Sequence, residues 1–309
     1  MKNRYKYFIT LIVVAIFSFS NQYMVAQDRG ILSRLQAVSN VDSDFYNVDG
    51  VKITYEVIKQ RFTMRNILHH YGQFIPEGSA LEHSDSTISQ QNFVYERIDS
   101  ICERVNIYTT YYFIEESAAG ITVITYSSPG KDSKEIQQEL NPLLLGKKIP
   151  ESVFNKMIFN SINFAGRKIE LGTYAAQWTN VNCVQWPYNG EMSWSIHRDQ
   201  AGAALSVEMQ RRITAENNSK EFSASLVSDE MVNVLFEGVP VVARKVVYKP
   251  EGEIAAKLAS TSDGETMVIY YVTAFVRNNW VSCMMSHWSN DAIGESGLPV
   301  LLEKVMTLR

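Results

Sequence analysis

Apolar and polar residues alternate over several segments of the N-terminal half, which is the pattern of strands with one buried face. Segment 51–57 alternates without a break, so its apolar positions would all lie on one side of a strand. Segments 108–114 and 121–126 are rich in β-branched and aromatic residues, and a short polar stretch separates them. These two segments predict a β-hairpin.

Other apolar residues of this half recur at helical spacing. The clearest stripe is formed by Val94, Ile98, Ile101, Cys102 and Val105, at positions i, i+4, i+7, i+8 and i+11. This stripe predicts a helix over 94–105. Comparable patterns predict helices over 63–71, 132–145 and 151–163.

From Arg167 onward the pattern changes to strand-like runs, many of them separated by turn-forming pairs such as Asn189-Gly190. The last two runs read as one long hairpin, because only three residues lie between them. Strands are predicted over 168–174, 191–198, 203–213, 230–236, 239–248, 254–261, 266–276 and 280–288.

The chain is predicted to end in a helix, because Leu298, Leu301, Leu302 and Val305 form a stripe at i, i+3, i+4 and i+7. We therefore expect an α+β fold, with an antiparallel sheet flanked by helices in the C-terminal half and a smaller α+β N-terminal part. The predicted organisation is a leader over 1–26, a polar lead-in over 27–50, an N-terminal part over 51–150 and a C-terminal domain over 151–309.

The first 26 residues have the order of a secretory signal peptide. Lys2, Arg4 and Lys6 precede an apolar run of 12 residues, which is too short to span a bilayer. A small residue, Ala26, then offers a cleavage site, and segment 23–27 resembles the end of bacterial signal peptides. We predict an exported protein, periplasmic or secreted, with no membrane span after cleavage.

The net charge of the protein limits the classes of partner that it can bind. The formal net charge is −4, and the leader carries three basic residues and no acidic residue, so its removal would leave −7. An acidic protein has no electrostatic footprint for nucleic acid, and we predict no nucleic-acid partner. Three widely spaced cysteines read best as small buried residues, with Cys183–Cys283 as the best disulfide candidate.

The order of elements in the last half carries a resemblance to a known family. Segment 236–248, the hairpin formed by 267–275 and 280–286, and the final helix follow one another as they do in PsbP/Mog1-like domains. The resemblance covers residues 167–309. It implies an α/β/α sandwich around an antiparallel sheet, and a small accessory or binding domain that is usually non-catalytic.

No catalytic signature stands out, and we predict no catalytic residue, no metal and no cofactor. The sequence contains no nucleophile elbow, zinc-protease motif, phosphate-binding loop or dinucleotide fingerprint. His69, His70 and His83 lie near several carboxylates, but adjacent histidines on a helix point about 100° apart. Surface histidines at the end of a helix are the simpler interpretation.

The most distinctive local feature is aromatic. Trp178, Trp186 and Trp194 recur at intervals of eight residues, Tyr188 lies among them, and amide side chains are interleaved. Exposed indoles beside amides make good surfaces for sugars or peptides, so these four residues are the candidate ligand-binding set. The alternative is that the rings fill the core between the sheet and its helix.

Together these patterns favour an exported, non-catalytic binding or assembly accessory protein of the bacterial cell envelope, with a glycan, a peptide or an envelope protein as partner. Two alternatives stay open. One is a hydrolase of an envelope polymer, which a cleft lined by a titratable group with a shifted pKa would favour. The other is a structural partner of an envelope complex, which a large apolar patch would favour.

Overall fold

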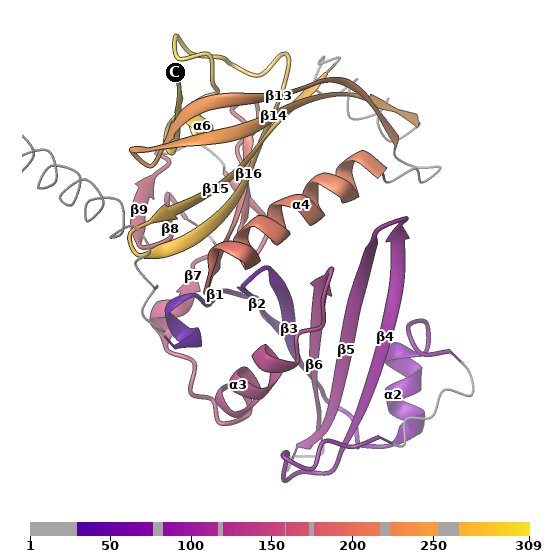
Figure 1. Cartoon of the computed structure of the whole chain (residues 1–309). Coiled ribbons are helices and arrows are strands. Elements are labelled where there is room, and N and C mark those ends of the chain that lie inside the picture. The colour runs from indigo at the N-terminus through magenta and orange to yellow at the C-terminus, as the bar shows by residue number, and fades with distance from the viewer. Residues whose placement is uncertain are drawn as a thin grey trace, which may run out of the picture.

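The structure is a computed structural model, and it describes residues 30–76, 83–116, 120–157, 159–172, 176–216, 223–252 and 266–309. The predicted leader and the predicted strand over 254–261 lie outside these residues. Two large, largely antiparallel sheets account for most of the described chain, and helix α4 runs between them (Figure 1). The coarse prediction of an α+β protein built on antiparallel sheet is confirmed. Within the described residues, no helix has the length and apolar character needed to cross a membrane.

The N-terminal sheet has seven strands in the order β4-β5-β6-β3-β2-β1-β7. Every neighbouring pair is antiparallel except β1 and β7. Its strands are β1 (Gln36–Ser39), β2 (Ser43–Val48), β3 (Val51–Ile58), β4 (Asn92–Cys102), β5 (Val105–Glu116), β6 (Gly120–Pro129) and β7 (Phe154–Asn155). The accompanying helices are η1 (Ile31–Ser33), α2 (Met64–Tyr71), α3 (Lys134–Leu145) and η2 (Glu151–Val153).

Each face of this sheet has its own core. On one face, α3 contributes Leu140 and Leu144 to a cluster with residues of β2, β3, β5 and β6. On the other face, Ile67 of α2 packs with Phe113 of β5 and Val123 of β6. The two helices therefore cover opposite sides of β5 and β6, and the alternation along these strands divides their side chains between the two cores.

The C-terminal sheet has eight strands in the order β10-β11-β12-β16-β15-β14-β13-β17. Its elements are β10 (Gln177–Asn180), β11 (Cys183–Gln185), β12 (Glu191–His197), α4 (Gln200–Glu216), β13 (Ser223–Phe236), β14 (Val239–Glu251), β15 (Met267–Val276), β16 (Asn279–Trp288), α6 (Val300–Glu303) and β17 (Met306–Leu308). A separate hairpin, β8 (Ser161–Phe164) and β9 (Arg167–Glu170), packs into the same core through Phe164 and Ile169.

Helix α4 lies against β12, β15 and β16 and also contacts β4 and β5 of the first sheet. The sequence-based prediction of a strand over 203–213 is therefore wrong. Because both sheets contact α4, its apolar residues are not confined to one stripe, and the helical period is weak in the sequence. Ala203, Ser206 and Met209 are its buried residues.

Three other expectations for the N-terminal half are corrected. The predicted helix over 94–105 lies mainly on β4, where pairing with β5 prevails over a stripe whose members Ile98 and Ile101 are in fact exposed. Segment 151–163 is not one helix, because it contains η2, β7 and the start of β8. The described residues 30–50 of the predicted polar lead-in form η1, β1 and β2, and β1 pairs with β7 beyond residue 150.

The C-terminal leucines lie in the core as predicted, but the helix is only one turn long. Leu298, Leu301 and Leu302 are fully buried in the second sheet's core. The chain then turns at Lys304 and forms β17, which pairs with the end of β13. Strand pairing therefore replaces the continuation of the helix that the leucine spacing predicts.

Candidate functional site

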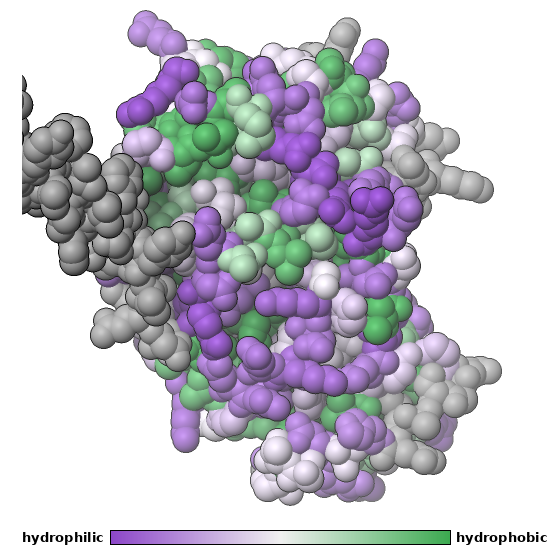
Figure 2. All heavy atoms as spheres, in the orientation of Figure 1, coloured by the Kyte–Doolittle hydropathy of each residue, from purple (hydrophilic) through white to green (hydrophobic). Residues whose placement is uncertain are grey.

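A hollow lined by both polar and apolar side chains lies between α3 and the loop that precedes β4. It encloses about 680 Å³. We call it the α3 groove and define it by six of its lining residues: Asp85, Ile88, Val94, Tyr112, Gln137 and Asn141. Hydrophilic residues dominate the surface near α3 in Figure 2, whereas a larger hydrophobic area lies at the upper left, where Figure 1 places β13, β14 and α6.

Helix α3 places two amides on its buried side. Gln137, Leu140, Asn141 and Leu144 are all buried and follow one another at i, i+3, i+4 and i+7. The leucines supply the apolar contact that holds the helix to the sheet. The amides lie on the same stripe, so they need hydrogen-bond partners from the sheet beneath them.

Two tyrosines of the sheet supply those partners. The Tyr112 hydroxyl donates to Gln137 Oε1 at 2.8 Å, and the Tyr126 hydroxyl donates to Asn141 Oδ1 at 2.7 Å. Burial raises the pKa of Tyr112 to about 12 and raises the pKa of Tyr126 well above its usual value. Both phenols therefore keep their protons at neutral pH and act as donors.

The side-chain amide nitrogen of Gln137 also forms hydrogen bonds. This nitrogen, Nε2, donates to Thr110 Oγ1 at 3.1 Å and to Ser133 Oγ at 2.9 Å. Polar atoms of the groove's floor are thus tied to both the sheet and the start of α3. A connected network of this kind holds the side chains in one arrangement before any ligand arrives.

The outer wall of the groove is held by Asn92 and Asp85. The Asp85 backbone N–H donates to Asn92 Oδ1 at 2.8 Å, and Asn92 Nδ2 donates to the carbonyl oxygens of Asp85 and Gln90 at 3.1 Å and 2.9 Å. The Asp85 carboxylate accepts bonds from the Thr87 N–H and hydroxyl at 2.8 Å and 2.6 Å. Loop 83–90 therefore has a defined shape although most of its side chains are exposed.

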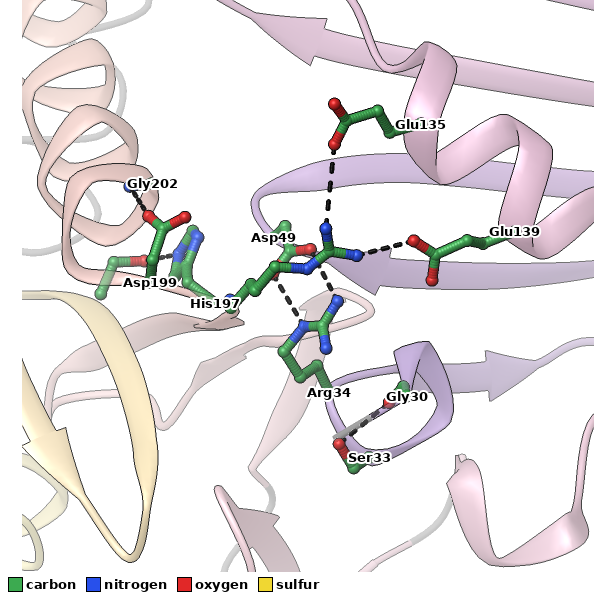
Figure 3. Close-up of polar contacts among 11 residues, drawn as sticks. Gly30, Ser33, Arg34, Asp49, Glu135, Glu139, His197, Asp199 and Gly202 are labelled. Carbon is green, nitrogen blue, oxygen red and sulfur yellow. Dashed lines mark hydrogen bonds and ion pairs between the residues drawn. The ribbon is translucent and has the colours of Figure 1, made fainter. Parts of the chain in front are cut away.

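A second polar site joins the two sheets, and Figure 3 shows it with Asp49 at its centre. Asp49 and Gly50 form the tight turn between β2 and β3, and both have positive φ angles, 51° and 82°. The Asp49 carboxylate accepts bonds from Arg34 Nε and Nη2 at 3.1 Å and 3.2 Å and from the Arg198 N–H at 2.8 Å. The backbone N–H of Asp49 donates to the Ile196 carbonyl oxygen at 3.0 Å.

Arg198 adds a second connection across the same junction. Its Nη2 lies 2.6 Å from Glu139 Oε1 and its Nη1 lies 3.8 Å from Glu135 Oε2, and both glutamates belong to α3. The end of β12 is thus tied to η1 and the β2–β3 turn through Asp49, and to α3 through Arg198. These contacts make the junction a fixed part of the fold.

His197 lies beside this junction and contacts a serine of a neighbouring strand. His197 Nε2 and Ser282 Oγ are 2.8 Å apart, and the two residues are only 2% and 1% exposed. Among the described residues, His197 Nδ1 has no hydrogen-bond partner. Burial lowers the pKa of His197 to about 4, although the Asp49 and Asp199 carboxylates act in the opposite direction.

The distance between His197 Nε2 and Ser282 Oγ is short enough for a histidine base to activate a serine nucleophile. Both side chains are almost wholly buried, and among the described residues no carboxylate is hydrogen-bonded to the second ring nitrogen, as the orienting residue of a catalytic triad would be. The nearby Asp199 Oδ1 instead accepts the N–H of Gly202 at 2.7 Å, at the start of α4. The adjoining cleft is small, about 260 Å³.

The four aromatic residues singled out from the sequence do not form one exposed surface. Trp194 and Trp186 are core residues, 1% and 7% exposed. Trp178 is partly buried, its Nε1 donates to the Lys156 carbonyl at 3.0 Å, and its ring lies near that of Trp194. Tyr188 is 62% exposed, in a turn where its φ angle is 62°. The core interpretation describes the tryptophans better than the platform interpretation.

The cysteines are unbonded. Cys183 and Cys283 are buried and free, so the disulfide suggested for this pair is absent; Cys183 Sγ lies 3.1 Å from Glu191 Oε1. Burial raises the pKa of both thiols. In the described ranges, no group of three or more His, Cys, Asp or Glu side chains could hold a metal ion.

None of the six residues that define the α3 groove belongs to the ligand-binding set predicted from the sequence. Two amides at i and i+4 inside an apolar stripe were the available signal, because a buried amide needs partners. The sequence predicts the strand over 280–288, but it cannot show that α4 covers the face of this strand that carries Ser282.

Comparisons with known proteins do not assign this chain to a family. The sequence matches no family model and no curated protein. Among solved structures, it is similar to DynU16 of the dynemicin biosynthetic locus (10% identity, 87% of this chain and 79% of that chain, TM-score 0.18) and to the di-domain ARO/CYC StfQ of the steffimycin pathway (11% identity, 87% and 79%, TM-score 0.18). Likenesses with TM-scores this low carry no argument about the function of this chain.

Proposed function

We propose that this chain is an exported, non-catalytic binding protein of the bacterial cell envelope, and that it holds a small ligand in the α3 groove. The groove is the observation that carries the proposal. Its volume of about 680 Å³ lies within the range of small-molecule sites. The signal-peptide pattern of residues 1–26 supports export to the periplasm or the cell exterior.

The construction of the groove supports binding. Tyr112, Gln137 and Asn141 are fixed by hydrogen bonds before a ligand is present, so little side-chain ordering is needed on binding. A floor whose polar side chains are already held in one arrangement suits the recognition of a ligand.

A thermal-shift screen with a blocked variant tests the proposal. A ligand at about 100 times its Kd stabilises a one-site protein by about 2.7 kcal/mol, which is a measurable shift in Tm. Gln138→Trp would fill the mouth of the groove and should abolish the shift, because Gln138 is an exposed lining residue. Gln73→Trp, on the exposed turn after α2, is the matched control. A ligand that stabilises both variants equally would place its site elsewhere.

A hydrolase of an envelope polymer has one observation in its favour, the contact between His197 and Ser282. The burial of both residues argues against it. The test is the release of soluble fragments from purified cell-wall polymer: an activity lost in Ser282→Ala while the variant keeps its thermal stability would favour the enzyme.

A structural partner of an envelope complex also has one observation in its favour. The β13–β14 ribbon exposes Leu226, Val227, Met231 and Val242. Scattered exposed apolar residues are common on soluble proteins, so this ribbon is weaker support than a preformed groove. The resemblance of residues 167–309 to PsbP/Mog1-like domains implies the same class of accessory role and stays a prediction.

A further inference from the structure

We propose that the α3 groove selects a neutral saccharide, an inference that rests on the proposed function and names its ligand class. The first argument is charge. Asp85, Glu96 and Lys134 line the groove together with His83. Glu96 Oε1 lies 4.0 Å from Lys134 Nζ, and the Asp85 carboxylate already accepts two hydrogen bonds from Thr87. An anionic ligand would lie near two carboxylates and one ammonium group. The described lining of the groove therefore offers no cluster of unpaired charges that would favour an anionic or a cationic ligand.

The second argument is the chemistry of the rim. Loop 83–90 presents the exposed hydroxyls of Ser84, Ser86 and Ser89, and the exposed amides of Gln90 and Gln138 stand around the same groove. Hydroxyls and primary amides both donate and accept hydrogen bonds. Sugar hydroxyls have the same double capacity, so a neutral saccharide can satisfy this rim without leaving a buried charge unpaired.

The third argument is the apolar surface between these polar groups. Ile88 and Val94 are buried at the wall of the groove, and Pro142 and Leu145 line it from α3. A sugar ring carries C–H groups on its faces and hydroxyls at its edge. The apolar strip can contact the ring face while the rim binds the hydroxyls.

A peptide fits this groove less well. A short free peptide carries a charged group at each end, and the groove has no matching pair of unengaged charges. An extended peptide would need the backbone of an edge strand. The Val94 N–H, at the β4 edge beside the groove, already donates to the His83 carbonyl at 2.9 Å. Strand addition is therefore blocked at this point.

The inference can be tested by nuclear magnetic resonance of the whole protein, purified from its native host. The side-chain amide signals of Gln137, Gln138 and Asn141 report on the groove directly. The probes are neutral disaccharides (maltose, cellobiose and di-N-acetylchitobiose), glucose 6-phosphate, and the dipeptide Ala-Ala. We expect at least one neutral disaccharide to shift these signals and to bind at least about tenfold more tightly than the phosphate or the dipeptide.

Variants separate recognition from a change of fold. The double variant Ser86→Ala with Gln138→Ala removes rim hydrogen bonds and should weaken the disaccharide about tenfold or more. Ser228→Ala with Gln73→Ala, at exposed positions away from the groove, is the control and should bind like the wild type. Equal affinity in both double variants would overturn the inference.

The two proposals fail in different ways. If glucose 6-phosphate or Ala-Ala shifts the groove signals and the neutral sugars do not, the saccharide class is wrong and the groove is still a binding site. If none of the probes shifts these signals and no compound in the thermal-shift screen depends on Gln138, both proposals are wrong.

Discussion

Acid should weaken this fold through one buried histidine. His197 is 2% exposed, and burial lowers its pKa to about 4 from a usual value of 6.5. Between about pH 6.5 and pH 4 the unfolded chain therefore binds a proton at this position that the folded chain does not. The free energy of unfolding should fall as the pH drops through this window, and below about pH 4 this residue should cause no further loss.

The size of the effect follows from the difference between the two pKa values. Each pKa unit corresponds to about 1.4 kcal/mol, so a pKa of about 4 against 6.5 gives a loss of about 3 kcal/mol over the full window. Because the ring is almost wholly buried, solvent screening reduces this value little. A loss of this size is a large fraction of the stability of a typical domain.

His197→Gln isolates this contribution. The Gln amide can still reach Ser282 Oγ but does not titrate, so the variant should lose about 3 kcal/mol less than the wild type between pH 7 and pH 4. The assay is urea unfolding followed by tryptophan fluorescence, with the free energy extrapolated to water at each pH. Other titrating groups affect both proteins alike and cancel in the comparison. If the two proteins lose the same stability over this window, His197 is not held neutral as we infer.

Three more outcomes follow from the packing. Glu237→Ala should cost about 3 kcal/mol in urea unfolding, because the buried carboxylate bridges two arginines that would lose their counter-charge. Trp194→Ala should cost about 3–5 kcal/mol in the same assay, whereas Tyr188→Ala should stay within about 0.5 kcal/mol. Gly50→Ala and Gly238→Ala carry the same backbone strain, since both φ angles are near 80°. Only the Gly50 variant adds an atom beside a neighbouring side chain, 3.1 Å away, so calorimetry should show a lower Tm for it than for the Gly238 variant.

The parts of the fold that the sequence predicted carry a clear local signal. Segment 51–57 alternates because one face of the strand is more buried than the other, and the hairpin over 266–288 is marked by two strand-like runs with only three residues between them. α3 shows a clear stripe because it lies on one sheet face. α4 contacts both sheets, and β4 is an edge strand with exposed isoleucines, so neither pattern indicates the element that forms.

The candidate site was harder to predict for a related reason. Gln137 and Asn141 looked like polar interruptions of an apolar stripe, and Tyr112 and Tyr126 looked like ordinary strand aromatics. Their function in the fold depends on the pairing of each amide of α3 with a phenol of β5 or β6, between residues that are 25 and 15 positions apart in the chain. A buried amide without a partner costs about 1–3 kcal/mol, so two amides on a buried helix stripe require hydroxyl or carbonyl partners on the sheet below. This requirement is physical and can be read from the sequence once the helix is placed, whereas the register that brings each tyrosine to its amide belongs to the tertiary structure.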